Sequence, residues 1–196
     1  MDDKSGIIWI GTYSNGLSAF NRKTGKFKHY LHNPSDPATL SDNRIYSLAE
    51  DKIGNIWIGT YGGGLNKIDK RSGHISRYQN NQKDSTSLSS NATWSITFDE
   101  TGKLWIGTFG AGVNVFNPED ETFRHLKNNP TDSTRISDNN IIRVFKDSND
   151  DMWFGTTKGL SRYYRESDSF KNYNEDDGLA NSFVYGIVED DHGDLW

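Results

Sequence analysis

Short runs of alternating apolar and polar residues fill the chain, and they return in the same order. One period shows them clearly, with "RIYSLAE" at 44–50, "IWIGT" at 56–60, "GLNKID" at 64–69 and "HISRY" at 74–78. Each run is rich in β-branched and aromatic residues, and glycine, asparagine or aspartate stands between the runs, where turns need positive φ. The pattern predicts four short strands in each period, and no segment of useful length has the helical period.

A repeated tryptophan marks the period. "WIGT" or a close variant begins at Trp9, Trp57, Trp105 and Trp153, and Trp196 stands in "GDLW", with spacings of 48, 48, 48 and 43 residues. A period of about 40 to 50 residues with four strands is typical of β-propeller blades. The repeats are expected at residues 4–51, 52–99, 100–147 and 148–190, and a further blade is expected to begin at 191–196.

The predicted fold class is therefore all-β, a β-propeller of four-stranded antiparallel blades, with about four blades in residues 1–196. The third period repeats the same strands, beginning with Thr93–Phe98 and ending with Thr122–Leu126. Seven blades of this period would need about 336 residues, so we expect part of a larger, about seven-bladed propeller. Two alternatives are a four-bladed ring closed by Phe183–Asp190 beside the first "WIGT" strand, and open strand edges that pair with neighbouring blades or a second copy.

The composition narrows the class of partner. The 196 residues include 22 Lys and Arg against 27 Asp and Glu, a net charge of −5 without a basic run, which argues against nucleic acid. No apolar run is long enough to span a bilayer, and no secretory signal of the usual form follows Met1. The absence of cysteine excludes disulfides, thiolate metal sites and cysteine nucleophiles.

Residues shared by every repeat are interpreted as structural. The repeated tryptophans are best explained by packing between blades, the alternative being that they stack on sugar rings. A repeated aspartate, followed by a turn, is interpreted as an Asx cap. Trp94 and its equivalents Tyr46, Ile142 and Tyr185 are interpreted as core residues. The aspartates are Asp51, Asp99, Asp147 and Asp190.

Residues that vary between repeats are the ligand-binding candidates. The long polar connections and the glycine turns after "WIGT" are expected on one face of the propeller, so a binding face would be built there. Tyr13, Tyr61 and Phe109 lie in these turns and are candidates to stack on sugar rings, although packing as lids over the blades is the alternative. Asn15 and Lys158 belong to the same turns.

Polar candidates stand on the first strand of the repeats. Arg44 and Asn140 are at its entry, and Arg143 stands where two other repeats have Ser47 and Ser95. Arginine binds a carboxylate or sulfate bidentately, which suits uronic acids and sulfated sugars. A salt bridge to an acid of a neighbouring blade is the alternative for Arg143.

No catalytic residue, metal site or cofactor is predicted. The five histidines do not converge in the repeats, which makes a zinc site improbable. "DSNDDM" at 147–152 has oxygen ligands at alternating positions, but Met152 stands where a calcium loop needs glycine. This segment is therefore interpreted as a turn.

Two stretches, "EDKIGNIWIGTYGGGLNKID" and "NEDDGLANSF", resemble the two-component regulator propeller repeat of bacterial hybrid two-component systems, and the resemblance covers essentially the whole chain. It implies a periplasmic sensor region of an inner-membrane protein, arranged in propellers of about seven blades and responsive to glycans or oligosaccharide fragments. A histidine kinase and its phosphorelay are then expected outside these residues, and no enzyme within them. The rival functions are a propeller glycoside hydrolase or lyase, and a protein-docking propeller.

Overall fold

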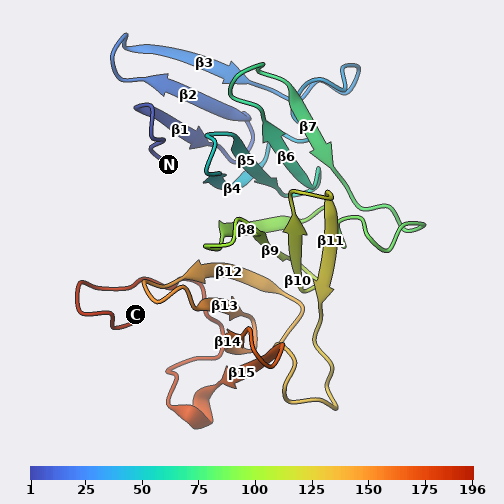
Figure 1. Ribbon diagram of the computed structural model, residues 1–196, viewed down its shortest axis with the longest axis vertical. Helices are drawn as coiled ribbons and strands as arrows, with labels where there is room; N and C mark the ends of the chain where they lie inside the picture. The colour runs from blue at the N-terminus through green and yellow to red at the C-terminus, as the bar shows by residue number, and fades with distance from the viewer. The chain divides into compact units, whose positions relative to one another are not determined.

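Antiparallel β-sheets make up the computed structural model, which describes residues 1–196 (Figure 1). One sheet has three strands and three sheets have four, and the strands of every sheet lie in chain order. The first sheet comprises β1 (Ile7–Gly11), β2 (Leu17–Asn21) and β3 (Lys26–Tyr30); the second comprises β4 (Ile45–Glu50), β5 (Ile56–Thr60), β6 (Leu65–Ile68) and β7 (Ile75–Tyr78).

The other two sheets repeat this order. They comprise β8 (Thr93–Phe98), β9 (Leu104–Thr108), β10 (Val113–Asn117) and β11 (Thr122–Leu126), then β12 (Ile141–Lys146), β13 (Met152–Thr156), β14 (Gly159–Tyr164) and β15 (Ser169–Tyr173). The predicted all-β class with four-stranded antiparallel blades is confirmed. One 3₁₀ turn, η1 (Glu175–Asp177), follows the last strand. The chain contains no helix with the length and apolar character needed to cross a membrane.

The predicted strand positions are confirmed to within one residue in the second period and without shift at β8 and β11. Residues 183–190, which have the sequence pattern of a first strand, form no strand. Instead, Val188 exchanges two backbone hydrogen bonds with Trp196, and Glu189 bridges to Leu195. Val184 N also donates to Thr156 O at 3.0 Å, so this segment makes isolated backbone hydrogen bonds and no regular ladder.

The chain divides into two compact units, residues 1–93 and 94–196. Each unit contains two sheets and its own hydrophobic core. The first core is built around Trp9 and Leu17 with isoleucines of β4, β5 and β6, and the second around Trp105 and Val113 with aromatic residues of β13, β14 and β15. The cores use equivalent positions of repeats that lie two periods apart, so residues can be compared between them directly.

A hydrogen bond between an indole and a carboxylate recurs in every repeat. Each repeated tryptophan donates its Nε1–H to the aspartate six residues before it, and the other carboxylate oxygen of that aspartate accepts backbone N–H groups of the intervening turn. The predicted Asx caps are therefore confirmed, and the same carboxylates also orient the tryptophans. The Nε1–Oδ2 distances are 2.9 Å for Trp9–Asp3, 3.1 Å for Trp57–Asp51, 2.8 Å for Trp105–Asp99, 2.8 Å for Trp153–Asp147 and 2.9 Å for Trp196–Asp190.

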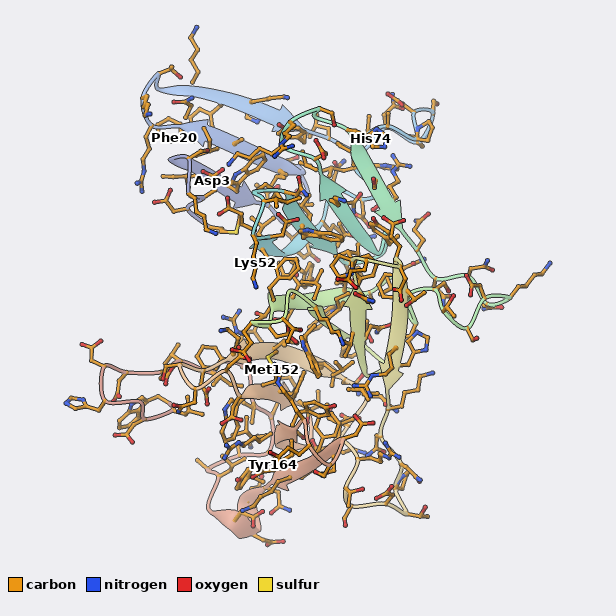
Figure 2. The ribbon with its side chains drawn as sticks, viewed as in Figure 1. Asp3, Phe20, Lys52, His74, Met152 and Tyr164 are labelled. Atoms are coloured by element: carbon orange, nitrogen blue, oxygen red, sulfur yellow. The ribbon has the colours of Figure 1, made fainter.

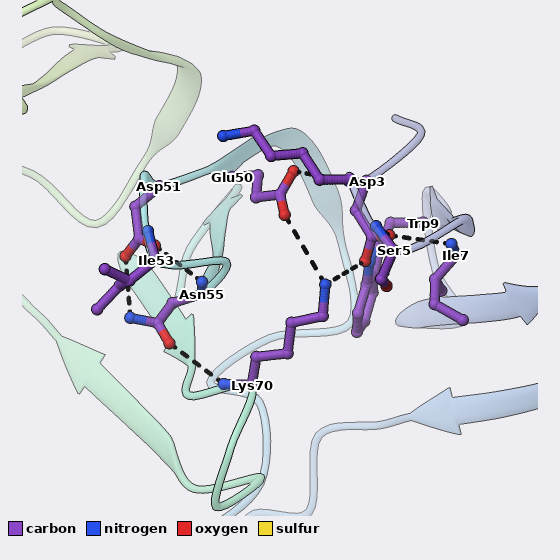
Figure 3. A network of polar contacts seen from close by, with 10 residues as sticks. Asp3, Ser5, Ile7, Trp9, Glu50, Asp51, Ile53, Asn55 and Lys70 are labelled. Atoms are coloured by element: carbon purple, nitrogen blue, oxygen red, sulfur yellow. Dashed lines mark hydrogen bonds and ion pairs between the residues drawn. The ribbon is translucent and has the colours of Figure 1, made fainter.

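Cations of the neighbouring sheet join two of these carboxylates. In the first unit, Lys70 Nζ lies 3.0 Å from Asp3 Oδ2 and 3.8 Å from Glu50 Oε1 (Figure 3). In the second unit, Arg165 Nη1 lies 3.0 Å from Asp99 Oδ2. Burial opposes ionisation of Asp3 and Asp99, but their hydrogen bonds outweigh it and hold the pKa of each carboxyl below its ordinary value.

The glycine of "WIGT" lets adjacent sheets of a unit approach closely. A Cβ built on Gly11 would lie 2.5 Å from Ile45 Cγ2, and a Cβ on Gly107 would lie 2.6 Å from Ile141 Cγ2. In both cases the "WIGT" strand of one sheet approaches the first strand of the next sheet, β1 approaching β4 and β9 approaching β12. Glycine is required at this place because of packing, since no positive φ is found there.

The buried carboxylate of the second unit should be a strong determinant of its stability. Asp99→Asn removes the charge that Arg165 faces and is expected to lower the free energy of unfolding by about 2 kcal/mol. Urea unfolding followed by tryptophan fluorescence measures the change. Asp191→Asn, at an exposed aspartate, is the control, and equal losses for the two variants would contradict this role.

Stability should also fall in acid, with a predictable sign. The pKa values of Asp3 and Asp99 are lower in the folded protein than in the unfolded chain, so the unfolded chain takes up protons first. Their contribution is therefore complete at pH values above about 5 and declines as the pH falls through the unfolded pKa of about 4 toward the lower folded values. Unfolding free energies measured against pH should fall less steeply for the double variant Asp3→Asn/Asp99→Asn; an unchanged slope would refute the assignment.

Adding one methyl group at the close approach should also destabilise the second unit. Gly107→Ala places the new carbon against Ile141 and Val144 and is expected to cost about 2 kcal/mol through overpacking. Thermal and urea denaturation test this expectation. Gly186→Ala, where a Cβ would meet nothing within 4 Å, should leave stability almost unchanged.

Candidate functional site

In each unit, the glycine turns and the long polar connections are tied together by backbone hydrogen bonds. Gly16 N donates to Asn43 O at 2.9 Å, and Gly112 N donates to Asn139 O at 2.9 Å. The threonine of "WIGT" supports the turn, as when Thr60 Oγ1 donates to Gly64 O at 2.7 Å. The predicted placement of these turns and connections on one face is therefore confirmed within each unit.

Arg44 is held on this face of the first unit by a bidentate ion pair. Its Nε lies 3.0 Å from Asp42 Oδ1 and its Nη2 lies 2.6 Å from Asp42 Oδ2. Gly62 makes room for the guanidinium, since a Cβ there would lie 2.9 Å from Nη2. Burial opposes ionisation of Asp42, but the hydrogen bonds from Arg44 outweigh it and lower the pKa of that carboxyl. The arginine is thus fixed in place while its side chain remains 42% exposed.

Three tyrosine rings lie next to one another in a row that begins at this arginine. The Arg44 guanidinium lies 4.8 Å from the ring centroid of Tyr61. Tyr61 and Tyr46 have ring centroids 5.4 Å apart, and those of Tyr46 and Tyr13 are 6.5 Å apart. Exposure is 74% for Tyr13, 38% for Tyr46 and 41% for Tyr61. The structure thus brings the predicted residues Tyr13, Arg44 and Tyr61 into one exposed aromatic and cationic cluster, which we call the tyrosine–arginine cluster.

Tyr46 completes the cluster, and its interpretation as a core residue was wrong. The pairing of β4 with β5 shifts register between Ile45 and Ser47, so Tyr46 is the extra residue of a β-bulge. Bulges re-aim side chains, and this one leaves Tyr46 exposed. Tyr185 is 78% exposed and is not a core residue either. Asp42 was also missed; the "SDN" triplets of the connections were the available signal.

The second unit arranges its predicted residues differently. Phe109 is 45% exposed and stacks on Trp94, with ring centroids 4.8 Å apart and planes at 20°. Asn140 Nδ2 donates to Asp138 Oδ2 at 3.3 Å, and the hydroxyl of Thr157 donates to the same carboxylate.

The remaining predicted residues are exposed but are not gathered. Asn15 lies in the same turn as Tyr13, and its backbone N–H donates to Thr12 Oγ1. Lys158 borders a polar hollow beside Asn128 and Asn172. The alternative for Arg143, a salt bridge to an acid of a neighbouring blade, is not found, and the Arg143 side chain is exposed. The position of a residue in the repeat therefore predicted its exposure more reliably than it predicted which residues lie together.

Solved structures with the same fold include a lyase and domains of signalling proteins. A domain assigned as the extracellular domain of a hybrid two component system from B. thetaiotaomicron matches with a TM-score of 0.74 and 24% identity, covering 100% of this chain and 31% of that one. The extracellular domain of a one component system from the same organism gives 0.75 and 22%, covering 97% and 24%. Virginiamycin B lyase from Staphylococcus aureus gives 0.73 and 19%, covering 100% and 60%.

These identities are low, and the shared property is the fold. The chain spans less than a third of the length of the two signalling structures. A search of curated protein sequences found no match. Residues 39–62, 87–110 and 135–158 match the two component regulator propeller family. Each match runs from a polar connection through the "WIGT" strand into the glycine turn, so three segments of this chain are similar to the repeat of that family.

Proposed function

We propose that this chain is a ligand-sensing, periplasmic part of a hybrid two-component regulator that recognises oligosaccharide fragments and signals to a downstream histidine kinase. The family repeats support the regulator class. The fold shared with extracellular domains of two-component and one-component systems supports an extracytoplasmic place. The tyrosine–arginine cluster is the observation that carries the choice of ligand, because it presents exposed aromatic rings beside a fixed guanidinium.

The chemistry of the cluster suits an acidic sugar. Aromatic rings offer flat apolar surfaces to the C–H faces of a pyranose, and their polar hydroxyl groups remain hydrogen-bonding partners. Asp42 binds the Nε and Nη2 edge of the Arg44 guanidinium, and the remaining N–H groups of Nη1 and Nη2 can donate to a carboxylate or sulfate. Because Asp42 and Tyr61 already hold this guanidinium, little side-chain entropy is lost when a ligand binds.

Three carboxylates that could be considered for catalysis, Asp42, Glu50 and Glu189, already take part in hydrogen bonds or ion pairs within the protein. Their engagement disfavours a glycoside hydrolase. Asp42 is paired with Arg44, Glu50 accepts from Lys4 N at 3.1 Å, and Glu189 accepts from Ser148 Oγ at 2.6 Å. Hydrolysis usually needs two available carboxyl groups about 5 to 10 Å apart. Binding without turnover is the function that this arrangement favours. Signalling then requires a ligand with different affinities for two states of the receptor.

Calorimetric titration tests the sensor against its rivals. The full-length ectodomain is titrated with neutral, uronic-acid-containing and sulfated oligosaccharides, and product release is assayed in parallel. Binding without product release is expected. Turnover would establish a hydrolase or lyase, and the absence of both would favour a protein-docking propeller; either result would overturn the proposal.

Substitutions in the cluster should separate stacking from charge recognition. Tyr61→Ala removes one ring and is expected to weaken binding of every active oligosaccharide by about tenfold. Arg44→Gln should weaken acidic oligosaccharides more than neutral ones, because only the former lose a charged partner. The control is Tyr164→Ala on β14 (Figure 2), an exposed tyrosine 5.0 Å from the guanidinium of Arg162, and it should bind as the wild type does. Equal losses for Tyr61→Ala and Tyr164→Ala would contradict the site.

A further inference from the structure

The hydrophobic cores of the two units are filled differently at equivalent positions. In the second unit, the Tyr163 ring packs on Trp105 with centroids 4.9 Å apart, and Phe170 packs on Tyr163 at 5.2 Å. Phe154 adds a further contact with Trp105 at 5.8 Å. These three rings fill the space between the two sheets of the second unit. The equivalent positions of the first unit hold isoleucines, Ile58, Ile68 and Ile75.

Three polar side chains of the second unit form a hydrogen-bonded triad that includes the hydroxyl group of one of these rings. Arg124 Nη1 donates to Asp168 Oδ1 at 2.8 Å, and its Nη2 donates to Tyr163 Oη at 3.1 Å. The Tyr163 hydroxyl donates to Asp168 Oδ1 at 2.6 Å. A phenol and a carboxylate are thus held together by one cation. The equivalent residues of the first unit are Lys28, Ile68 and Gly73, which keep the cation but supply neither phenol nor carboxylate.

A cavity of about 370 Å³ lies at this place in the first unit, between its two sheets. Its walls are apolar, and its volume is within the range of small-molecule sites. Trp9, Ala19 and Lys28 stand side by side across β1, β2 and β3, as Trp105, Val115 and Arg124 do across β9, β10 and β11. Tyr30 and Lys26 are larger than their equivalents, Leu126 and Thr122. Tyr30 packs on Trp9 with ring centroids 5.7 Å apart. The remaining wall residues include Ile7, Ile56 and Ile68.

The rim of this cavity carries more positive than negative charge. Lys26 and Lys28 border it, and Lys28 Nζ lies 4.6 Å from the Tyr30 ring centroid with no ion pair. Lys70 is already balanced by Asp3 and Glu50. Asp69 Oδ1 accepts from the N–H groups of residues 71 and 72 and from the hydroxyl of residue 72. Its charge offsets only one of the two lysines Lys26 and Lys28, so the rim keeps an excess of positive charge. An anionic ligand is therefore favoured over a neutral or cationic one.

We propose that the cavity between the first and second sheets binds a small aromatic carboxylate. The second unit shows the arrangement that such a ligand would reproduce: a ring against the repeated tryptophan, and a carboxylate beside the cation of the outer strand. In the first unit the ring of the ligand takes the place of the Tyr163 side chain, and its carboxylate meets Lys28. This site uses different residues from the tyrosine–arginine cluster and does not depend on the proposed recognition of oligosaccharides.

The probe is 4-hydroxyphenylacetate, which carries the phenol and the carboxylate that the first unit lacks. Titration of the full chain, followed by ¹H–¹⁵N spectra, should give saturable shifts of the Trp9 indole and of residues 26–30. The neutral amide 4-hydroxyphenylacetamide should bind about fivefold more weakly at low salt, because it lacks the charge that Lys28 meets. No saturable shift, or equal affinity for acid and amide, would overturn the proposal.

Two variants test the position of the site. Lys28→Arg/Ile68→Tyr/Gly73→Asp transfers the triad of the second unit into the first and should weaken binding by about tenfold or more, because protein atoms fill the cavity. Gly73 has φ of 74° and Asp168 has φ of 48°, so the new aspartate adopts a conformation already used at its equivalent.

Lys28→Gln leaves the cavity open and should weaken the acid about fivefold without affecting the amide. Lys23→Gln, at an exposed lysine outside the cavity, is its matched control. Circular dichroism verifies that each variant is folded. Wild-type affinity of either the folded triple variant or Lys28→Gln would refute the site, as would an equal loss in Lys23→Gln.

Discussion

A buried carboxylate that binds an indole N–H is the interaction on which each blade depends. Asp99 and Trp105 are 3% and 2% exposed, so their polar atoms are largely withdrawn from water and must be satisfied by the protein. One carboxylate oxygen organises the turn between two strands, and the other fixes the tryptophan that packs between sheets. Local turn geometry and packing between sheets are therefore set by the same side chain.

The partners of this carboxylate vary, although the carboxylate does not. Asp3 faces the ammonium of Lys70, and Asp99 faces the guanidinium of Arg165. Asp51 instead accepts from the side-chain amide of Asn55 at 2.9 Å. A buried anion needs donors that point at it, and an amide, an ammonium or a guanidinium can supply them. The repeat thus tolerates substitution around the anion more readily than loss of the anion itself.

Most of the fold could be predicted from the sequence because its determinants are local. The bounds of a strand such as Ile56–Thr60 follow from two signals, the strand-like run itself and the turn residues on either side of it. Both signals depend only on residues that are neighbours in the chain. The constant separation of six residues between aspartate and tryptophan was also visible, but spacing alone does not show that two side chains meet. The β-bulge at Tyr46 could not be predicted, because alternation fixes two faces of a strand without showing where the register shifts. Residues 183–190 show another limit, because their strand-like pattern forms no strand.

The candidate sites lie at opposite ends of the strands, and this follows from the antiparallel order. β6 begins next to the glycine turn that carries Tyr61 and ends at Ile68. Ile68 and Gly73, in the turn that follows, border the cavity. The connections are held at the first end by backbone hydrogen bonds and by the side chains of Asn66 and Arg77, whereas the buried carboxylates and their cations hold the other end. Replacing aromatic rings by isoleucines there gives up packing contacts that the second unit retains. Isoleucine, tyrosine and phenylalanine occupy the same places on nearly the same backbone, so the free space depends on side-chain volume and not on a different fold. A ligand in the cavity would therefore restore, between two sheets, contacts that the chain itself supplies one pair of blades later.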